Sequence, residues 1–162
     1  YGPNFDQRVK DTEVELKFSI GDYNFRGIID RLDHPEPGKW EVHDYKTTKH
    51  PKSKRQAMND LQLALYQIAV EQNYGKVNDI SLTWHFLRTS QRDPLGSEVT
   101  VIHTREKLEK LRNKLIRKVE QIIQYMDNEN NFVPKETMLC NWCYLWEECM
   151  AKSDINPVKR AD

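Results

Sequence analysis

Residues 27–46 read GIIDRLDHPEPGKWEVHDYK and place a dense turn signal between two segments typical of β-strands. The turn signal is the proline and glycine cluster at 35–38, and the strand-like segments are 23–32 and 40–45. Another alternating segment, 13–20, precedes them and ends at a Gly-Asp turn. This pattern predicts an antiparallel meander in the first part of the chain.

The predicted hairpin can bring two carboxylates together. If Pro37 is the centre of the turn, residues whose numbers sum to 74 lie opposite each other, as Asp30 and Asp44 do. Directly opposed residues have Cβ atoms about 4.5–5.5 Å apart, a distance at which like charges repel. A cation that prefers hard oxygen ligands, Mg²⁺ or Mn²⁺, would offset this repulsion. Lys46 projects from the same strand face as Asp44. Two acids and a lysine around one cation can orient water and lower its pKa.

The alternative is that these charges form exposed ion pairs, but the motifs around them favour a catalytic site. In chain order the motifs are GIIDR at 27–31, DYK at 44–46 and QLALY at 62–66. Together they resemble the PD-(D/E)XK nuclease superfamily, and within it the RecB-like and AddB-like nucleases, which carry G-x-x-D-R, D-x-K and Q-x-x-x-Y elements. The resemblance covers about residues 13–70 and the cysteines near the end of the chain.

The resemblance implies a role for each matching residue. Asp30 and Asp44 would bind the catalytic Mg²⁺ or Mn²⁺, together with the backbone carbonyl of Tyr45. Lys46 would position or activate the attacking water.

Two further residues of the resemblance, Gln62 and Tyr66, are one helical turn apart and would face the sheet. Gln62 would contact the metal shell or a DNA phosphate. Tyr66 is either part of the site or an aromatic core residue. Glu15 is either an auxiliary acid or part of the solvent face of its strand.

A basic segment follows the DYK motif directly, with five bases and no acid in 46–55. We expect it to form a loop that binds DNA phosphates, although a solvated segment has the same composition. Residues 105–118 contain seven bases and two acids, and we interpret these charged residues as the solvent-exposed face of an amphipathic helix. The expected DNA-binding residues are Arg31, Lys49, Lys52, Lys54 and Arg55.

All the cysteines of the chain, Cys140, Cys143 and Cys149, are spaced C-x2-C-x5-C. Thiolates at this spacing can bind one soft metal centre. The spacing resembles the late part of the iron-sulfur motif of AddB-type nucleases, in which one early cysteine completes a 4Fe-4S cluster. This chain has no early cysteine, so the fourth ligand would come from upstream sequence, from a His or from outside the protein. Zinc bound by the cysteines and a His, or buried thiols without a metal, are the alternatives.

Composition sets limits on the class of protein. The chain has 162 residues, 25 bases and 25 acids, and 38% apolar residues, which fits one globular domain and excludes a large multidomain enzyme. No apolar stretch approaches the ~18 residues that a membrane span needs, and no signal pattern is present. We therefore expect a cytoplasmic protein without a membrane partner. The chain starts at Tyr1 without an initiator Met, as is typical of a fragment.

These observations predict an α/β fold: a restriction-endonuclease-like central mixed sheet with helices on both faces and a cysteine-bearing C-terminal tail. Residues 1–135 would form a nuclease core with its N-terminal part missing, and residues 136–162 a metal or iron-sulfur staple. Further expected elements are helices at 56–74 and from 105 to about 127, and strands at 80–87 and 98–103.

The predicted function is metal-dependent hydrolysis of DNA phosphodiester bonds. We expect a single-strand or end-processing exonuclease module of repair, recombination or phage DNA metabolism, with an attached or associated helicase. A catalytically inactive DNA-end-binding module and a zinc-stabilised interaction domain are the alternatives.

Overall fold

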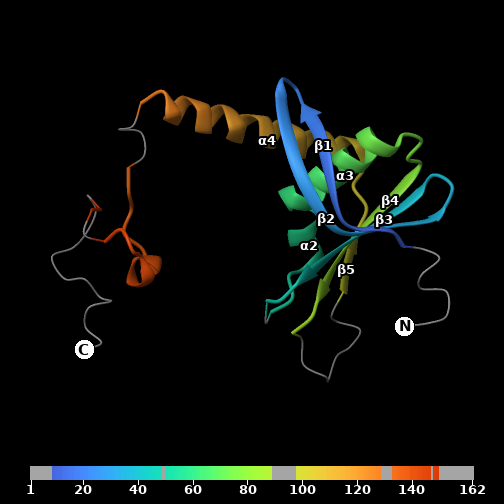
Figure 1. Ribbon diagram of the computed structural model, residues 1–162, viewed down its shortest axis with the longest axis horizontal. Helices are drawn as coiled ribbons and strands as arrows, with labels where there is room; N and C mark the ends of the chain where they lie inside the picture. The colour runs from blue at the N-terminus through green and yellow to red at the C-terminus, as the bar shows by residue number, and fades with distance from the viewer. Residues whose placement is uncertain (1–8, 49, 89–97, 129–132, 147, 150–162) are drawn as a thin grey trace. The chain divides into compact units, whose positions relative to one another are not determined.

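The structure is a computed structural model that describes residues 9–48, 50–88, 98–128, 133–146 and 148–149. Its strands and α-helices are labelled in Figure 1. The chain forms two compact units, residues 1–118 and residues 119–162.

A five-stranded mixed sheet forms the first unit, with the strands in the order β1-β2-β3-β4-β5. Neighbouring strands are antiparallel except β3 and β4, which are parallel. A parallel pair requires a crossover connection, which α2 and α3 supply between β3 and β4. The mixed sheet flanked by helices confirms the predicted fold class. The strands are β1 (Val9–Ile20), β2 (Tyr23–Glu36), β3 (Lys39–Lys46), β4 (Asp79–Phe86) and β5 (Glu98–Val101).

The crossover differs from the single helix predicted for residues 56–74. Asp60 accepts hydrogen bonds from the backbone N–H groups of Gln62 and Leu63, so it caps a new helix rather than continuing an old one. Ser53 caps a short helix before it, and part of the segment expected to be a loop is therefore helical. The helices are α2 (Lys54–Ala57), α3 (Leu61–Tyr74), α4 (Arg105–Met126) and the 3-10 helix η3 (Met138–Trp142).

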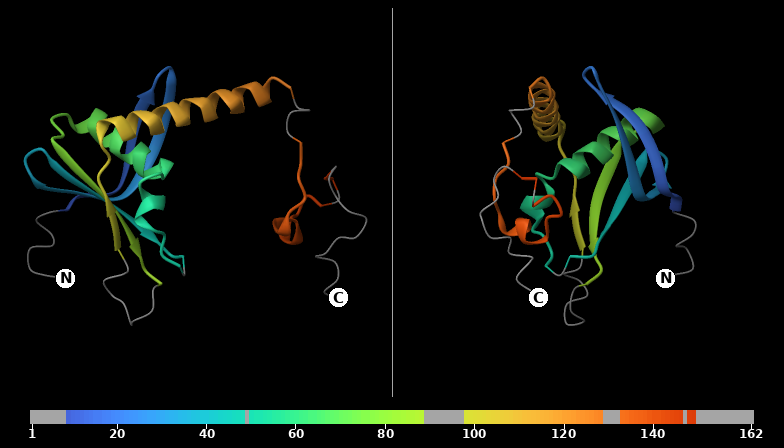
Figure 2. Two further views of the ribbon diagram at one scale, coloured as in Figure 1. Left: turned by 180° about the vertical axis from the view of Figure 1, so that it is seen from behind. Right: turned by 60° about the vertical axis from the view of Figure 1, so that its left-hand side comes forward.

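The hydrophobic core lies between one face of the sheet and α3, which crosses that face in both views of Figure 2. Leu63, Ile68 and Val70 of α3 are buried there, and α4 joins the same core through Leu108 and Leu111. Burying one such side chain stabilises the fold by about 1.5–3 kcal/mol. Helices were expected on both faces of the sheet. Among the described residues none covers the other face, where Ile28 is 48% exposed and Tyr45 39% exposed.

The register of the hairpin follows the predicted rule. Arg31 lies opposite His43, Leu32 opposite Val42, and Asp33 opposite Glu41, and each pair of numbers sums to 74. The register shifts only nearer the turn, between Asp33 and Glu36. The strands extend beyond the predicted bounds at β2, which continues to Glu36, whereas β5 ends earlier, at Val101.

The second unit contains the last turns of α4 and, after them, η3. The Thr137 side chain caps η3 by accepting from the backbone N–H of Leu139 at 3.3 Å. Across the described residues, no helix combines the length and the apolar character that crossing a membrane requires.

Candidate active site

Lys46 is the centre of a polar group at the end of β3. Its Nζ atom lies 2.5 Å from Oδ2 of Asp44 and donates to Oε1 of Gln62 at 2.8 Å. The amide nitrogen of Gln62 donates to the hydroxyl of Tyr66 at 2.9 Å. The structure thus brings together two residues of β3 and two of α3 that are distant in sequence.

Local sequence explains this meeting. Asp44 and Lys46 are two residues apart on a strand, so their side chains share a face. The cap at Asp60 starts α3 immediately before Gln62, which places Gln62 in the first turn and Tyr66 one turn later on the same helix face.

Asp30 comes to the same site from β2. Its Oδ2 atom accepts a hydrogen bond from the backbone N–H of Tyr45 at 2.8 Å. The pairing of Arg31 with His43, continued by one residue, sets Asp30 opposite Asp44. The carboxylate of Asp30 is near enough to contribute to raising the pKa of Asp44. The role of the Tyr45 carbonyl as a metal ligand stays a prediction.

Burial controls the electrostatics of the site. Asp44 is only 2% exposed, and this desolvation raises its pKa, while the ammonium of Lys46 acts in the opposite direction. Desolvation, together with the carboxylates of Asp44 and Asp30, raises the pKa of Tyr66 to about 12. Tyr66 therefore stays neutral beside Asp44.

The acidic residues fit a divalent cation. Oδ2 of Asp44 is buried and receives no aligned hydrogen bond from the described residues, although Lys46 Nζ lies 2.5 Å away. A buried carboxylate oxygen without an aligned hydrogen-bond donor can still coordinate a cation. Asp30 supplies a second carboxylate from the neighbouring strand. Such a cation would supply Lewis-acid activation of water and phosphate. The chain's own Lys46 would hold a proton beside the attacking water.

The predicted DNA-binding residues are found in different environments. Lys52, Lys54 and Arg55 are exposed, and Lys52 Nζ lies 4.9 Å above the Trp84 ring centroid. A cleft of about 460 Å³ beside them is lined by Gln62 as well as Lys52 and Trp84. Lys49 lies outside the described residues.

Arg31 and Glu15 take other partners. Arg31 donates from Nε to Oδ1 of Asp33 at 2.7 Å and from its terminal nitrogen to Oδ2, and its side chain is only 13% exposed. This pair raises the pKa of Arg31. Glu15 forms an exposed ion pair with Arg26 at 2.7 Å, which agrees with the interpretation as the solvent face of its strand.

A second polar group was not predicted from the sequence. Asp33, Glu41 and His43 each present one potential metal-ligand atom, and these atoms lie within 4.8 Å of one another. Burial lowers the pKa of His43 to about 4, and the Asp33 carboxylate acts in the opposite direction. The register rule that paired Asp30 with Asp44 also pairs Asp33 with Glu41, so the signal was present in the sequence.

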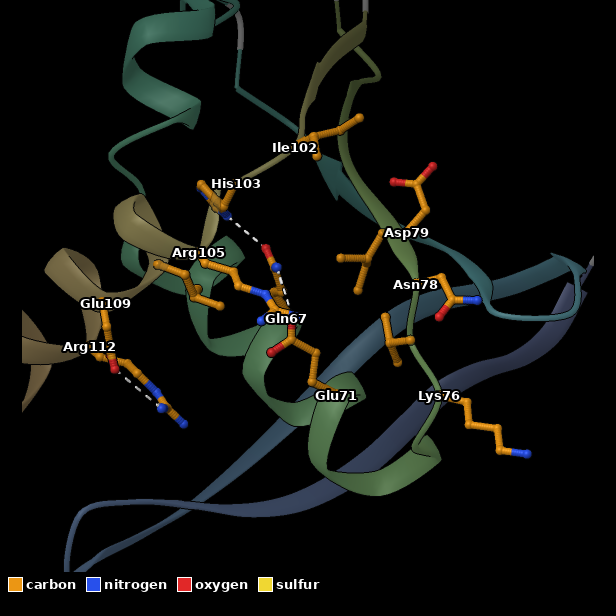
Figure 3. A pocket seen from close by; sticks show the side chains of 13 residues that line it. Gln67, Glu71, Lys76, Asn78, Asp79, Ile102, His103, Arg105, Glu109 and Arg112 are labelled. Atoms are coloured by element: carbon orange, nitrogen blue, oxygen red, sulfur yellow. Dashed lines mark hydrogen bonds and ion pairs between the residues drawn. The ribbon is translucent and has the colours of Figure 1, made fainter.

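Another cleft, of about 620 Å³, lies where α3, the start of β4 and the start of α4 meet, and is lined by none of the predicted site residues. Figure 3 shows the side chains around it, including a chain of polar contacts. The buried His103 is bonded through Nδ1 to Gln67 Oε1 at 3.1 Å, and Gln67 donates to Glu71 at 2.8 Å.

The cysteines are free thiols, each partly buried. Cys140 lies within η3, where its sulfur accepts from the backbone N–H of Thr137 at 3.3 Å, and Cys143 caps the end of η3. Among the described residues, the group that converges as potential metal ligands is Asp33, Glu41 and His43 rather than the cysteines.

Comparison with known proteins is consistent with this geometry. No curated protein sequence gives a significant match. One similar solved structure is that of a protein from Eubacterium rectale described as a "Putative exonuclease", with a TM-score of 0.56 and 17% sequence identity. The alignment covers 99% of this chain and 60% of that one, so this chain spans about three fifths of its length. The family model of the PD-(D/E)XK nuclease superfamily matches residues 4–150. The chain therefore belongs to the PD-(D/E)XK nuclease superfamily.

Proposed function

We propose that this chain is a metal-dependent deoxyribonuclease with its active site at Asp30, Asp44 and Lys46. The observation that supports this most is the placement of Lys46 Nζ, 2.5 Å from a buried carboxylate oxygen of Asp44 that has no aligned donor. This oxygen would become a ligand of a cation held by Asp44 and Asp30. Lys46 would then turn toward the attacking water. Mg²⁺ and Mn²⁺ are the ions that such oxygen ligands prefer.

Gln62 and Tyr66 support the site from α3. Gln62 accepts from Lys46 and donates to Tyr66, so it sets the direction in which the ammonium points. Tyr66, which is neutral because its pKa is about 12, is a positioning residue that holds Gln62 through its hydroxyl without adding charge.

DNA would approach along the exposed basic residues that follow β3. Lys52, Lys54 and Arg55 lie in or beside the short helix α2, next to the cleft that Gln62 lines. These residues, with Lys49, would bind phosphates on either side of the scissile bond. Arg31 is left out of this set because it is paired with the buried Asp33.

The finer assignment is an exonuclease module of the RecB-like and AddB-like type that acts on single strands or DNA ends beside a helicase. The motif order supports it, and the similar structure from Eubacterium rectale is described as a "Putative exonuclease". In this assignment Cys140, Cys143 and Cys149 bind a 4Fe-4S cluster with a fourth external ligand, or zinc, and residues 136–162 are a staple. Anaerobically prepared protein that includes upstream sequence should then be brown, and Cys143→Ser should remove the colour.

The test is cleavage of end-labelled linear single-stranded and duplex DNA, with circular single-stranded DNA to reveal endonuclease activity. Cleavage should require Mg²⁺ or Mn²⁺ and fall at least ~100-fold in Asp44→Asn and Lys46→Met. Asp22→Asn, an exposed acid in the β1–β2 turn, is the matched control and should keep full activity. Cleavage that survives chelation, or full activity in Asp44→Asn, would contradict the assignment. DNA binding without cleavage would favour the inactive end-binding module.

A further inference from the structure

The group formed by Asp33, Glu41 and His43 lies apart from the proposed active site. Asp33 and Glu41 are directly opposed on β2 and β3, and His43 follows two residues after Glu41 on the same strand face. Asp44 and Lys46 alternate with His43, so their side chains leave β3 on the opposite side of the sheet. No residue of this group belongs to the proposed catalytic set.

A hydrogen-bonded relay fixes the proton on His43. Nδ1 of His43 lies 2.8 Å from Nε2 of His85, and Nδ1 of His85 lies 3.0 Å from Oε1 of Glu98. An ionised carboxylate, here that of Glu98, can only accept a hydrogen bond, so Nδ1 of His85 carries the proton. Nε2 of a neutral His85 then has no proton and accepts the hydrogen bond from His43. His43 must then donate from Nδ1, which leaves its Nε2 atom with a free lone pair.

That lone pair is directed at two further acceptors. Nε2 of His43 is buried, without a hydrogen-bond partner among the described residues, and lies 3.5 Å from Asp33 Oδ2 and 3.7 Å from Glu41 Oε2. Three acceptor atoms around one point, with no proton between them, are the ligand arrangement of a cation site. Arg31 contacts both carboxylate oxygens of Asp33. Each carboxylate oxygen has two lone pairs, so Oδ2 can still bind a metal.

We propose that Asp33, Glu41 and His43 bind a zinc ion, with His85 and Glu98 orienting His43 from behind. An imidazole together with carboxylates favours zinc over Mg²⁺, which takes oxygen ligands alone. A carboxylate bonded to the second nitrogen of a ligand histidine, here through His85, is the usual outer shell of such a site.

The surroundings suit this ion in charge and access. Two carboxylates and the guanidinium of Arg31 leave one net negative charge for a divalent cation to balance. Glu41 is 39% exposed, so the ion can enter from solvent and keep a water ligand. The ligands come from β2 and β3 and the relay from β4 and β5, so the zinc would tie four strands together on the face that no described helix covers.

The experiment measures zinc binding to the full chain with all three cysteines replaced by serine, because the cysteines themselves can bind zinc. After chelator treatment, the protein should bind one zinc ion more tightly than ~10 μM in competition with a chromophoric chelator, with millimolar Mg²⁺ present.

Variants separate the ligands from their support. His43→Gln and Glu41→Gln should each weaken zinc binding at least 100-fold, and Glu98→Gln by about 10- to 100-fold, as expected for an outer-shell residue. Glu36→Gln, an exposed acid on the same strand as Asp33, is the matched control and should bind zinc normally. Because Glu41 is partly exposed, its variant tests the site even if His43→Gln does not fold.

Two results would overturn the proposal: less than one zinc ion bound per chain in the cysteine-free protein, or unchanged zinc affinity in Glu41→Gln. Asp44→Asn distinguishes this proposal from the nuclease assignment, because it should lose DNA cleavage and keep zinc binding. Zinc binding that disappears in Asp44→Asn would place the ion in the nuclease site and refute the separate one.

Discussion

Replacing Lys46 with methionine tests whether its ammonium compensates a buried charge. Lys46→Met keeps most of the apolar stem and removes the contacts with Asp44 at 2.5 Å and with Gln62 at 2.8 Å. Asp44, 2% exposed, would then be ionised without its cation, and removing one partner of a buried ion pair typically costs about 3–5 kcal/mol.

Protonation of Asp44 limits this cost. The ordinary pKa of the carboxyl group is 3.8. Protonating it at pH 7 costs about 1.4 kcal/mol for each of roughly three pH units, or about 4 kcal/mol in all. We therefore expect the metal-free variant to lose about 2–4 kcal/mol of unfolding free energy at pH 7.

The sign of the pH dependence follows from the same carboxyl group. In the variant its folded pKa lies further above 3.8, so the folded chain holds a proton that the unfolded chain releases. The penalty is therefore small near pH 4 and grows as pH rises toward the folded pKa. Urea unfolding of wild type and Lys46→Met at pH 4.5 and pH 7 measures it. Equal penalties at both pH values, or a penalty under ~1 kcal/mol at pH 7, would refute the compensation of Asp44 by Lys46.

Two predictions concern the scaffold. Gly38→Ala should lower the unfolding free energy by about 1–3 kcal/mol, measured by urea unfolding. Gly38 has a positive φ of 80°, and a Cβ there would lie 2.5 Å from Asn78 Nδ2 and 3.3 Å from the backbone carbonyl oxygen of Lys76; an unchanged unfolding free energy would contradict this. Burial lowers the pKa of His103, so the unfolded chain takes up a proton that the folded chain resists, and stability should fall as pH drops below 6.5. Thermal melts should show a weaker fall in His103→Gln and an unchanged one in His50→Gln, which replaces an exposed His; identical profiles in all three would exclude His103 as the cause.

The hairpin was predictable from its dense turn signal, but its register also depends on an irregularity in the strands. Glu36 pairs with Lys39, a sum of 75, and the register shift between Asp33 and Glu36 brings the later pairs to the sum of 74 obtained by counting outward from Pro37. The break before α3 was not predicted, because apolar residues continue across it at helical spacing. Only the preference of Asp60 for a cap, where its carboxylate satisfies two backbone N–H groups, separates α2 from α3.

The zinc site that we propose includes residues that counting along one hairpin cannot relate. Asp33 and His43 could be related from the turn alone, but His85 and Glu98 enter only through the parallel pairing of β3 with β4 and the next antiparallel pair. A parallel register is set by how a crossover packs rather than by a short turn, so no local signal relates His43 to His85.

The same crossover explains why α3, rather than a loop, completes the candidate active site. After β3 the chain must return to start β4 parallel to it, and the returning helix covers the buried face of the sheet. The first turn of α3 therefore passes the end of β3, where Lys46 donates to Gln62. Because Gln62 and Tyr66 lie on a helix that is packed into the core, the direction of Lys46 is set by the same packing that stabilises the sheet.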